Sequence, residues 1–141
     1  MGKAASVIIC THNRAGTLDQ VLAGLSTQTA PVDSFELLVV DNNSTDHTRA
    51  VVERWGQKLS HLRYSFEPQQ GLSYARNRGL EEARAPIVAY LDDDAVPEPQ
   101  WLSSLLTAYE TITPMPAAVG GKILLRWEGD QRPAWLHPDL T

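Results

Sequence analysis

Near its N-terminus the chain reads Val7-Ile8-Ile9-Cys10-Thr11-His12-Asn13-Arg14, an apolar run that breaks into polar residues. An unbroken apolar run of this length is typical of a strand that is covered on both faces in a parallel sheet. The apolar residues that follow have the spacing of one helical stripe, which Ala30-Pro31 would end. They are Leu18, Val21, Leu22 and Leu25. The stretch therefore predicts a strand, a polar loop and an amphipathic helix.

The same alternation recurs in the next forty or so residues. Residues 35–40 predict a second buried strand that ends at Asp41, and Ser44 is the expected N-cap of a helix burying Val51, Val52 and Trp55. Residues 62–66 alternate apolar and polar side chains, which indicates a strand nearer the edge of the sheet.

The second half of the chain continues the pattern. We expect a helix that buries Leu72, Ala75, Gly79, Leu80 and Ala83, with Gly79 permitting a close approach to its neighbour. A fourth strand over residues 87–91 precedes a fourth helix, and residues 117–125 predict a fifth strand interrupted by Gly120-Gly121. The apolar positions of the fourth helix are Trp101, Leu102, Leu105, Leu106 and Tyr109.

Five strands alternating with four helices predict an open, mostly parallel α/β sheet with flanking helices. With 141 residues, of which 43% are hydrophobic, the chain fits one globular domain. We expect residues 1–126 to form an α/β ligand-binding domain. Residues 127–141 carry glycine and proline between scattered apolar residues and predict an irregular tail.

Charge and cysteine content exclude several classes of protein. The net charge is −5, from 12 Lys+Arg and 17 Asp+Glu, and no basic stripe offers a surface for nucleic acid. The single cysteine, Cys10, cannot form an internal disulfide or a thiolate zinc cluster, which favours a reducing, cytoplasmic location. No stretch approaches the roughly 18 apolar residues of a spanning helix, so only peripheral membrane association stays open.

Polar residues follow three of the predicted strands directly. They are Thr11-His12-Asn13-Arg14, Asp41-Asn42-Asn43-Ser44 and Asp92-Asp93-Asp94. In open α/β sheets ligands bind beyond the carboxyl ends of the strands, so these three loops are the candidate site.

The run Asp92-Asp93-Asp94 is the candidate for a metal and diphosphate site. Two carboxylates about 5 Å apart repel by roughly 3 kcal/mol at an effective dielectric constant near 20, and a cation removes that repulsion. Mg²⁺ and Mn²⁺ take oxygen ligands, commonly one or two carboxylates together with diphosphate oxygens. The alternative is a solvated acidic turn.

Other polar residues have two interpretations each. Asp41 can accept hydrogen bonds from a nucleobase or a ribose, or it can cap the following helix. Arg14, Arg76 and Arg78 can pair with phosphate oxygens or be ordinary exposed arginines. The histidines lack metal-ligand spacing, and Cys10 is expected to be a core residue. P-loop, G-x-G-x-x-G and G-x-S-x-G motifs are absent from the sequence.

Four motifs, in order, resemble the inverting family 2 glycosyltransferases of the GT-A fold. Residues 6–14 resemble the opening strand and Thr-x-Asn-Arg loop, and residues 35–46 the second strand with its Asp-x-x-Ser-x-Asp turn. Residues 71–79 are similar to the Gly-x-x-x-Ala-Arg-Asn-x-Gly helix. Residues 90–97 resemble the Asp-x-Asp signature, which Pro99-Gln100-Trp101-Leu102 follows. The resemblance covers residues 5–125.

The resemblance implies a Rossmann-like, nucleotide-sugar-binding half of the GT-A fold, with UDP as the expected nucleotide and Mn²⁺ or Mg²⁺ as cofactor. It places nucleotide contacts at Thr11, Asn13, Arg14, Asp41, Asn43, Arg76, Asp92 and Asp93. It places metal contacts at Asp92 and Asp94.

The resemblance also implies a general base beyond the Asp-x-Asp strand. Only Glu128, Asp130 and Asp139 are available there, none in a recognisable motif, so no catalytic residue is assigned. We therefore expect the donor-binding portion of a longer enzyme, with residues 127–141 beginning its acceptor-binding region. One alternative is a catalytically inactive binding module of the same fold. Another is a receiver-like signalling domain, although Tyr64-Ser65-Phe66-Glu67 occupies the place of its acceptor aspartate. The sugar, the acceptor and the oligomeric state are not determined.

Overall fold

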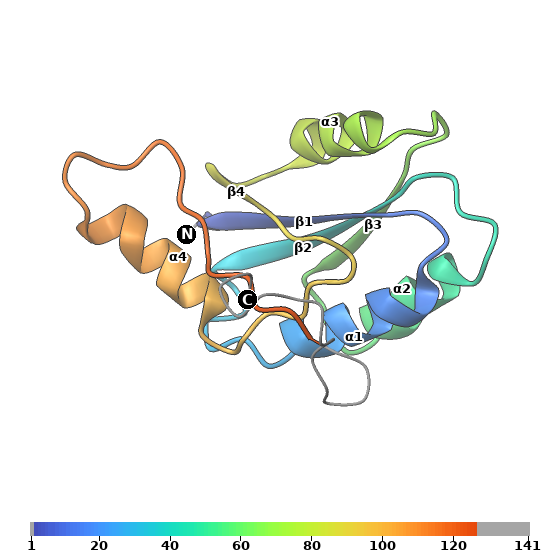
Figure 1. Cartoon of the computed structure of the whole chain (residues 1–141), viewed down its shortest axis with the longest axis horizontal. Helices are drawn as coiled ribbons and strands as arrows, with labels where there is room; N and C mark the ends of the chain where they lie inside the picture. The colour runs from blue at the N-terminus through green and yellow to red at the C-terminus, as the bar shows by residue number, and fades with distance from the viewer. Residues whose placement is uncertain (1, 127–141) are drawn as a thin grey trace, which may run out of the picture.

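Four parallel strands form a single sheet in the order β3-β2-β1-β4 (Figure 1). The structure is a computed structural model that describes residues 2–126. The strands are β1 (Ala5–Thr11), β2 (Phe35–Asp41), β3 (Leu62–Phe66) and β4 (Ile87–Tyr90). The expected open, parallel α/β sheet is thus confirmed, as is the edge position of residues 62–66.

Helices cover both faces of this sheet. α1 (Ala15–Leu25) and α2 (Thr48–Gly56) lie against one face and α3 (Leu72–Glu82) against the other, whereas α4 (Trp101–Thr111) lies near the amino-terminal end of β1 (Figure 1). Side chains alternate across each strand, so Val7 and Ile9 face α1, while Ile8 packs with Ala75 of α3. The predicted stripe of α1 is fully buried. It consists of Leu18, Val21, Leu22 and Leu25.

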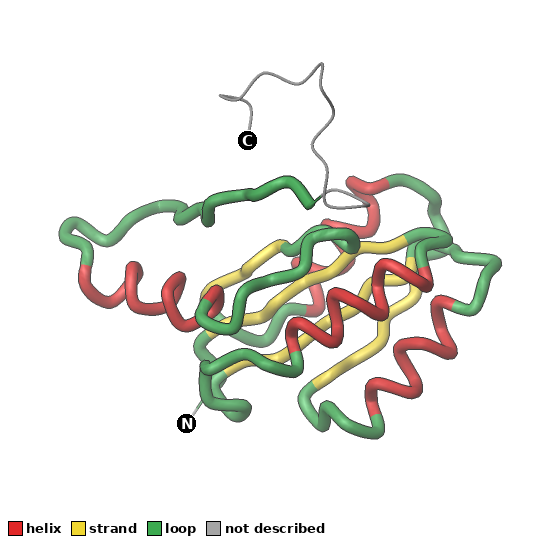
Figure 2. Tube along the Cα trace, turned by 60° about the horizontal axis from the view of Figure 1, so that its bottom comes forward, coloured by secondary structure: helices red, strands yellow, loops and turns green. Residues whose placement is uncertain are grey.

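The fifth strand predicted over residues 117–125 is wrong. This segment has no regular secondary structure and runs outside the sheet (Figure 2). Ile123 is 84% exposed and Leu124 65%, so their side chains contact no second layer of structure. Apolar character alone predicts a strand, but a strand also needs a hydrogen-bonding partner, and β4 pairs only with β1 in the described residues.

The predicted start of the second helix is also wrong. α2 begins at Thr48 and not next to Ser44. Asp46 accepts hydrogen bonds from the backbone N–H of Thr48 (2.9 Å) and from its hydroxyl (2.6 Å). These bonds stabilise a helix start at Thr48, two residues after Asp46. The Ser44 hydroxyl instead accepts a hydrogen bond from the backbone N–H of Asn13.

α3 buries a narrower face than its sequence predicts. Ala75 and Gly79 are buried, but Leu72 and Leu80 are 54% and 56% exposed. The helix lies so close to the sheet that a Cβ atom on Gly79 would be 2.5 Å from Ile8 Cγ2. Small residues alone fit at this distance, which confirms the expected role of Gly79.

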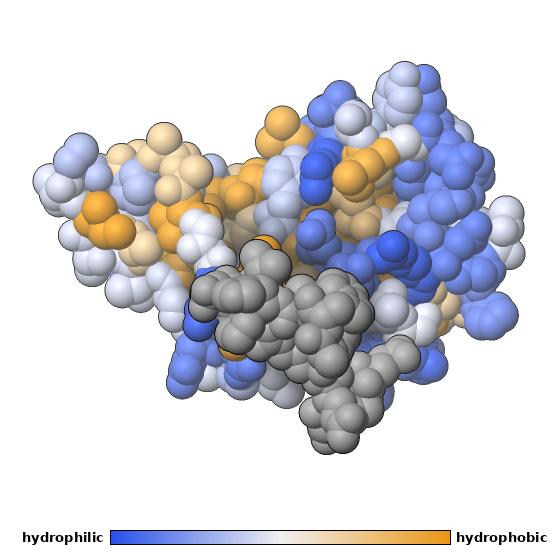
Figure 3. Space-filling view, viewed as in Figure 1, coloured by the Kyte–Doolittle hydropathy of each residue, from blue (hydrophilic) through white to orange (hydrophobic). Residues whose placement is uncertain are grey.

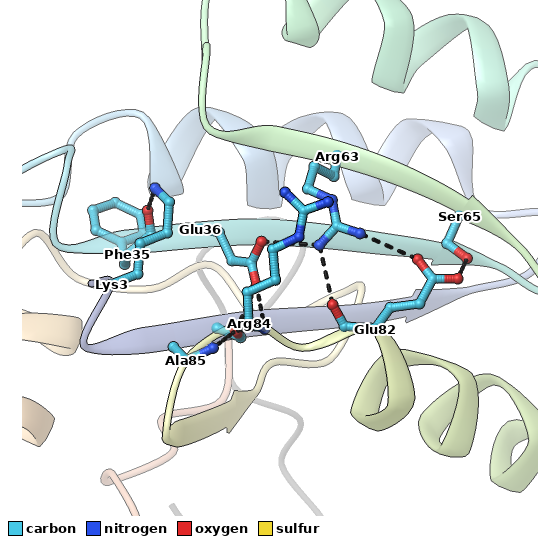
Figure 4. A network of polar contacts seen from close by, with 9 residues as sticks. Lys3, Phe35, Glu36, Arg63, Ser65, Glu82, Arg84 and Ala85 are labelled. Carbon is cyan, nitrogen blue, oxygen red and sulfur yellow. Dashed lines mark hydrogen bonds and ion pairs between the residues drawn. The ribbon is translucent and has the colours of Figure 1, made fainter. Parts of the chain in front are cut away.

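Glu36 joins four elements near the amino-terminal end of the sheet (Figure 4). It is 1% exposed, and its Oε1 accepts hydrogen bonds from Ser6 Oγ of β1 (2.7 Å) and from the backbone N–H of Arg84 (2.8 Å). Its Oε2 accepts one from Arg63 Nη1 of β3 (2.9 Å), and Arg63 also binds the carbonyl of Glu82. A cavity of about 350 Å³ lies beside this network. Both carboxylate oxygens of Glu36 therefore accept hydrogen bonds that stabilise the fold.

No helix within residues 2–126 combines the length and the apolar character that crossing a membrane requires.

Replacing Gly79 with alanine is expected to destabilise the fold by about 1–3 kcal/mol, because the added methyl group overlaps the buried side chain of Ile8. Urea unfolding followed by circular dichroism measures the change. Gly16→Ala is the matched control, since a Cβ there meets nothing within 4 Å. That helical position should gain up to ~1 kcal/mol. Equal stabilities of the two variants would contradict the close approach of α3.

Replacing Glu36 with glutamine is expected to cost about 1–3 kcal/mol at neutral pH. Although burial raises the pKa of Glu36, hydrogen bonds from Ser6, Arg63 and the Arg84 backbone lower it overall below its ordinary 4.5. Its ionised form therefore stabilises the fold above that pH, and the contribution disappears as the pH falls toward the folded-state pKa. Urea unfolding at pH 7 and pH 3 should show the difference between wild type and variant shrinking in acid. A constant difference would contradict this assignment.

Candidate functional site

The register of the sheet brings three loops to one edge. Thr11 pairs with Asp41, and the backbone N–H of Asn42 donates to the Thr11 carbonyl (2.8 Å). On the other side of β1, the N–H of Leu91 donates to the Ile8 carbonyl (3.0 Å), so Asp92 follows directly at the same edge. The surface over the loops after β1, β2 and β3 is predominantly hydrophilic (Figure 3).

Asn13 and Asp46 tie the loop after β1 to the loop after β2. Asn13 has a positive φ of 52°, a conformation that asparagine tolerates better than most residues. Its Oδ1 accepts hydrogen bonds from the backbone N–H groups of Thr45 (2.7 Å) and Asp46 (3.2 Å). In return, Asp46 Oδ2 accepts the N–H of Ala15 at the start of α1 (3.1 Å). The two loops therefore hold each other in place.

Asp41 is 2% exposed, and both of its carboxylate oxygens accept hydrogen bonds. Oδ1 accepts the backbone N–H of Ser44 (2.9 Å), and Oδ2 accepts the hydroxyl of Tyr64 (2.8 Å). Burial and this bond to Asp41 raise the pKa of Tyr64 to about 12, which keeps its hydroxyl a donor at every physiological pH. Asp41 thus holds the loop after β2, and the neighbouring Asn43 is exposed with a positive φ of 62°.

Asn42 lies in a loop that the sequence analysis selected, but that analysis gave it no role of its own. Its side-chain amide donates to the carbonyls of Glu67 (3.2 Å) and Gln69 (2.8 Å), and its Oδ1 accepts the N–H of Gly71 (2.7 Å). Its backbone carbonyl also lies 2.8 Å from His12 Nδ1. Asn42 therefore fixes the loop before α3. Its place directly after the second apolar strand was the only signal for it in the sequence.

The three aspartates after β4 differ in their surroundings. Asp93 is 8% exposed, and burial raises its pKa, whereas Asp92 and Asp94 are exposed. Arg14 Nη1 lies 3.2 Å from Asp93 Oδ1 and 2.7 Å from Asp94 Oδ2. Arg76 Nη2 lies 3.7 Å from Asp92 Oδ1. Each carboxylate of the run therefore has an arginine near it.

A cavity of about 430 Å³ opens between these loops and the start of α3. Its walls are formed by residues of β1, the three loops and α3: Cys10, Thr11, His12, Arg14, Asn42, Leu72, Ala75, Asp92, Asp93 and Asp94. The Thr11 hydroxyl is buried there, in a residue only 3% exposed, next to the Asp93 carboxylate, and no hydrogen bond of ordinary geometry satisfies it among the described residues. An unsatisfied polar atom in a cavity wall is a place for a ligand to bond.

The predicted site residues fall into two groups. Thr11, Arg14 and the aspartates 92–94 line the cavity, and Arg76 pairs with Asp92 beside it. Asn13, Asp41 and Asn43 belong to the loops around the cavity and are not among its lining residues. Arg78 instead pairs with Glu67 (3.2 Å) and holds α3 to the end of β3.

Cys10 lines the cavity but is unsuited to nucleophilic chemistry. It is half-buried, and burial raises the pKa of its thiol to about 11. The thiol is therefore protonated at neutral pH, when only the thiolate would be reactive. Its packing with Ile8 and Val40 agrees with the expected core role.

The donor set suits a hard divalent cation whose coordination is completed by a ligand. Within residues 2–126 there is no group of three or more His, Cys, Asp or Glu side chains placed to hold a metal alone. Asp92 and Asp94 offer exposed carboxylate oxygens at the mouth of the cavity. Mg²⁺ sites of this kind commonly use one or two carboxylates together with phosphate oxygens and water.

Comparison with known proteins agrees with this geometry. Residues 6–131 match the family model described as "Glycosyl transferase family 2". The chain belongs to glycosyltransferase family 2. It is 38% identical over 117 residues to the validoxylamine A glucosyltransferase of Streptomyces hygroscopicus subsp. jinggangensis (strain 5008), which covers 82% of this chain and 28% of that protein. The receiver-domain interpretation is therefore wrong.

Two solved structures share the fold. S. aureus TarS (residues 1–349) superposes with a TM-score of 0.71 and 30% sequence identity, covering 76% of this chain and 32% of that one. The mannosyltransferase PcManGT from Pyrobaculum calidifontis, solved in complex with GDP-Man and Mn²⁺, gives a TM-score of 0.67 and 31% identity, covering 77% and 32% of the two chains. The family 2 glycosyltransferase chain thus has the expected Rossmann-like GT-A sheet, and it spans about a third of the length of these structures.

Replacing Asn42 with alanine is expected to lower the free energy of unfolding by about 1–3 kcal/mol, because the buried polar groups of the 67–71 loop lose their partner. The amide of Gly71 should exchange its hydrogen faster, as measured by hydrogen–deuterium exchange. Asn77→Ala, at an exposed position of α3, is the control and should change stability by less than ~0.5 kcal/mol. Unchanged exchange at Gly71 would contradict the role of Asn42.

Proposed function

We propose that this chain is the donor-binding portion of an enzyme that transfers a sugar from a nucleotide diphosphate sugar to an acceptor, with inversion and with metal assistance. The observation that carries the proposal is the cavity itself. Within a family 2 glycosyltransferase domain it combines acidic residues, an arginine and the unsatisfied Thr11 hydroxyl. Those groups suit a diphosphate, its counter-cation and a hydroxyl-bearing ligand.

UDP is the proposed nucleotide. TarS, at 30% identity, has been solved with UDP and with UDP-GlcNAc, which supports a uridine nucleotide here. PcManGT, solved with GDP-Man, supports guanine as the alternative to uracil. A carboxylate acceptor such as Asp41 suits both bases, because uracil and guanine each carry a ring N–H that can donate to it. Cytosine has an acceptor nitrogen at the corresponding position.

We assign the nucleotide contacts to the loops that meet at the edge of the sheet. Asp41 would accept from the base through lone pairs that Ser44 and Tyr64 leave free, because each carboxylate oxygen can accept more than one hydrogen bond. Thr11, Asn13 and Asn43 would border the nucleoside from the same loops. Arg14 and Arg76 would reach the phosphates, and Asp92 and Asp93 the ribose.

Asp92 and Asp94 are the proposed metal ligands, because they are the exposed carboxylates of the run. Burial raises the pKa of Asp93, which makes it the least suited of the three to serve as an anionic ligand. When bound, Mn²⁺ or Mg²⁺ would neutralise the negative charge that develops on the departing nucleoside diphosphate.

The proposed reaction is a single displacement. An acceptor hydroxyl oxygen forms a bond to the anomeric carbon while the bond from that carbon to the diphosphate oxygen breaks, and the electron pair leaves with the nucleoside diphosphate. A general base takes the hydroxyl proton. No residue is assigned to that role, and Glu128, Asp130 and Asp139 lie outside the described residues.

The remaining proposals concern the whole protein. Residues 1–126 would form the nucleotide-sugar-binding domain, and residues 127–141, which lie outside the described part, would begin the acceptor-binding region. The acceptor is a sugar, a lipid or a protein. We propose a cytoplasmic location, with peripheral association at the inner face of a membrane as an option, and no nucleic-acid partner.

Calorimetric titration of UDP, GDP and dTDP into the purified chain, with Mn²⁺ and then with EDTA, tests the donor site without the unknown acceptor. The expected result is metal-dependent binding of UDP in preference to the other two. Absence of binding by all three nucleotides in both conditions would contradict the proposal.

Two aspartate variants separate the proposed roles. Asp41→Ala is expected to weaken UDP binding about tenfold or more with or without Mn²⁺, the size of one hydrogen bond to a charged group. Asp94→Ala should chiefly abolish the difference between Mn²⁺ and EDTA. Asp33→Ala, at the opposite end of the sheet beside Glu36, is the control and should bind UDP like the wild type. Identical behaviour of the Asp41 and Asp94 variants would refute the assignment.

A further inference from the structure

Arg14 connects the loop after β1 to the loop after β4. Its partners there, Asp93 and Asp94, lie 79 and 80 residues further along the sequence. It follows β1 and occupies the N-cap position of α1, and its Nη1 donates to both Asp93 Oδ1 (3.2 Å) and Asp94 Oδ2 (2.7 Å). One guanidinium nitrogen therefore serves two neighbouring carboxylates of the run that follows β4.

Electrostatics explains why the guanidinium lies there. Three consecutive aspartates repel one another, and a positive charge between two of them relieves that repulsion. The hydrogen bond to Asp94, with the negative charge of Asp93, raises the pKa of Arg14 above its ordinary value. Arg76 stands 3.7 Å from Asp92 and relieves the third carboxylate more weakly.

The same contact conflicts with a cation at these carboxylates. A divalent cation bound to Asp94 would repel the guanidinium a few ångströms away, and Asp94 Oδ2 already accepts a short hydrogen bond. Arg14 is also free to leave. Its side chain is 52% exposed and makes no hydrogen bond to the start of α1, so among residues 2–126 its departure breaks only the two carboxylate contacts.

We propose that Arg14 competes with the divalent cation for the carboxylate of Asp94, so that the cation binds strongly only together with a diphosphate. This inference rests on the proposed function. Diphosphate oxygens give the guanidinium an alternative, bidentate partner, and its movement onto them releases the aspartates. Nucleotide and cation then each raise the affinity for the other by the same factor.

The competition predicts a property of the chain with no nucleotide present. Removing the positive charge of Arg14 should increase the affinity for Mn²⁺ alone, about tenfold, because the repulsion between the cation and the guanidinium is lost. If Arg14 acted only by binding phosphate, replacing it would leave the affinity for Mn²⁺ alone unchanged, because no nucleotide is present in that measurement. A general loss of structure would weaken Mn²⁺ binding instead of strengthening it.

The test is titration of Mn²⁺ alone into wild type and Arg14→Gln, with free Mn²⁺ followed by electron paramagnetic resonance. Arg54→Gln is the matched control, because Arg54 pairs with Asp19 at 2.6 Å and is 55% exposed, but lies on α2 away from the cavity. Arg14→Met removes the same charge and repeats the test should the glutamine variant unfold, which thermal unfolding in EDTA establishes beforehand.

We expect Arg14→Gln to bind Mn²⁺ about tenfold more tightly than wild type and Arg54→Gln to match wild type. Adding UDP should raise the Mn²⁺ affinity of wild type more than that of Arg14→Gln. Equal Mn²⁺ affinities of wild type and a folded Arg14 variant in the absence of nucleotide would overturn the inference. A failure of the proposed function is separately visible, since UDP, GDP and dTDP would then leave the Mn²⁺ affinity of every variant unchanged.

Discussion

The parallel pairing of β1 with β2 is the constraint on which the rest of the structure depends. Its register runs from Ala5 opposite Phe35 to Thr11 opposite Asp41, so both strands end at the same level. Parallel β4 adds to the other side of β1, and its following aspartates reach the same edge. Most polar groups of the candidate site therefore come from residues at the end of a strand or in the loop directly after it, with Arg76 of α3 as an exception. A shift of this register by one residue would also turn each core side chain to the opposite face.

Hydrogen bonds of polar side chains hold both ends of this sheet where regular structure stops. At the carboxyl end, Asn13, Asn42 and Asp46 accept or donate bonds that belong to neighbouring loops. At the amino end, the buried carboxylate of Glu36 joins three strands and the chain after α3. The loops around the cavity are thus positioned by short polar side chains, which leaves the cavity wall open to a ligand.

Charge balance at the carboxyl edge links the fold to the proposed activity. The run of aspartates is tolerated because arginines lie beside it, with Arg14 on Asp93 and Asp94. In the free protein, the arginine and carboxylate groups that would bind a diphosphate and its cation therefore form ion pairs with each other. Binding at such a site is an exchange of partners, in which each new contact replaces an ion pair of the free protein.

The sequence by itself determined the alternation of strands and helices, the family resemblance and the acidic loop after β4, because these depend on side chains close together along the chain. It failed where distant contacts decide. The apolar run 117–125 lacks a strand partner, and Leu72 and Leu80 stay exposed because Gly79 brings α3 close to Ile8. Only the tertiary structure placed Arg14 on aspartates 79 and 80 residues away and left the Thr11 hydroxyl unsatisfied in a cavity wall. Such contacts depend on how the strands pair in the sheet and on which loops meet at its edge, and no local pattern of residues encodes either.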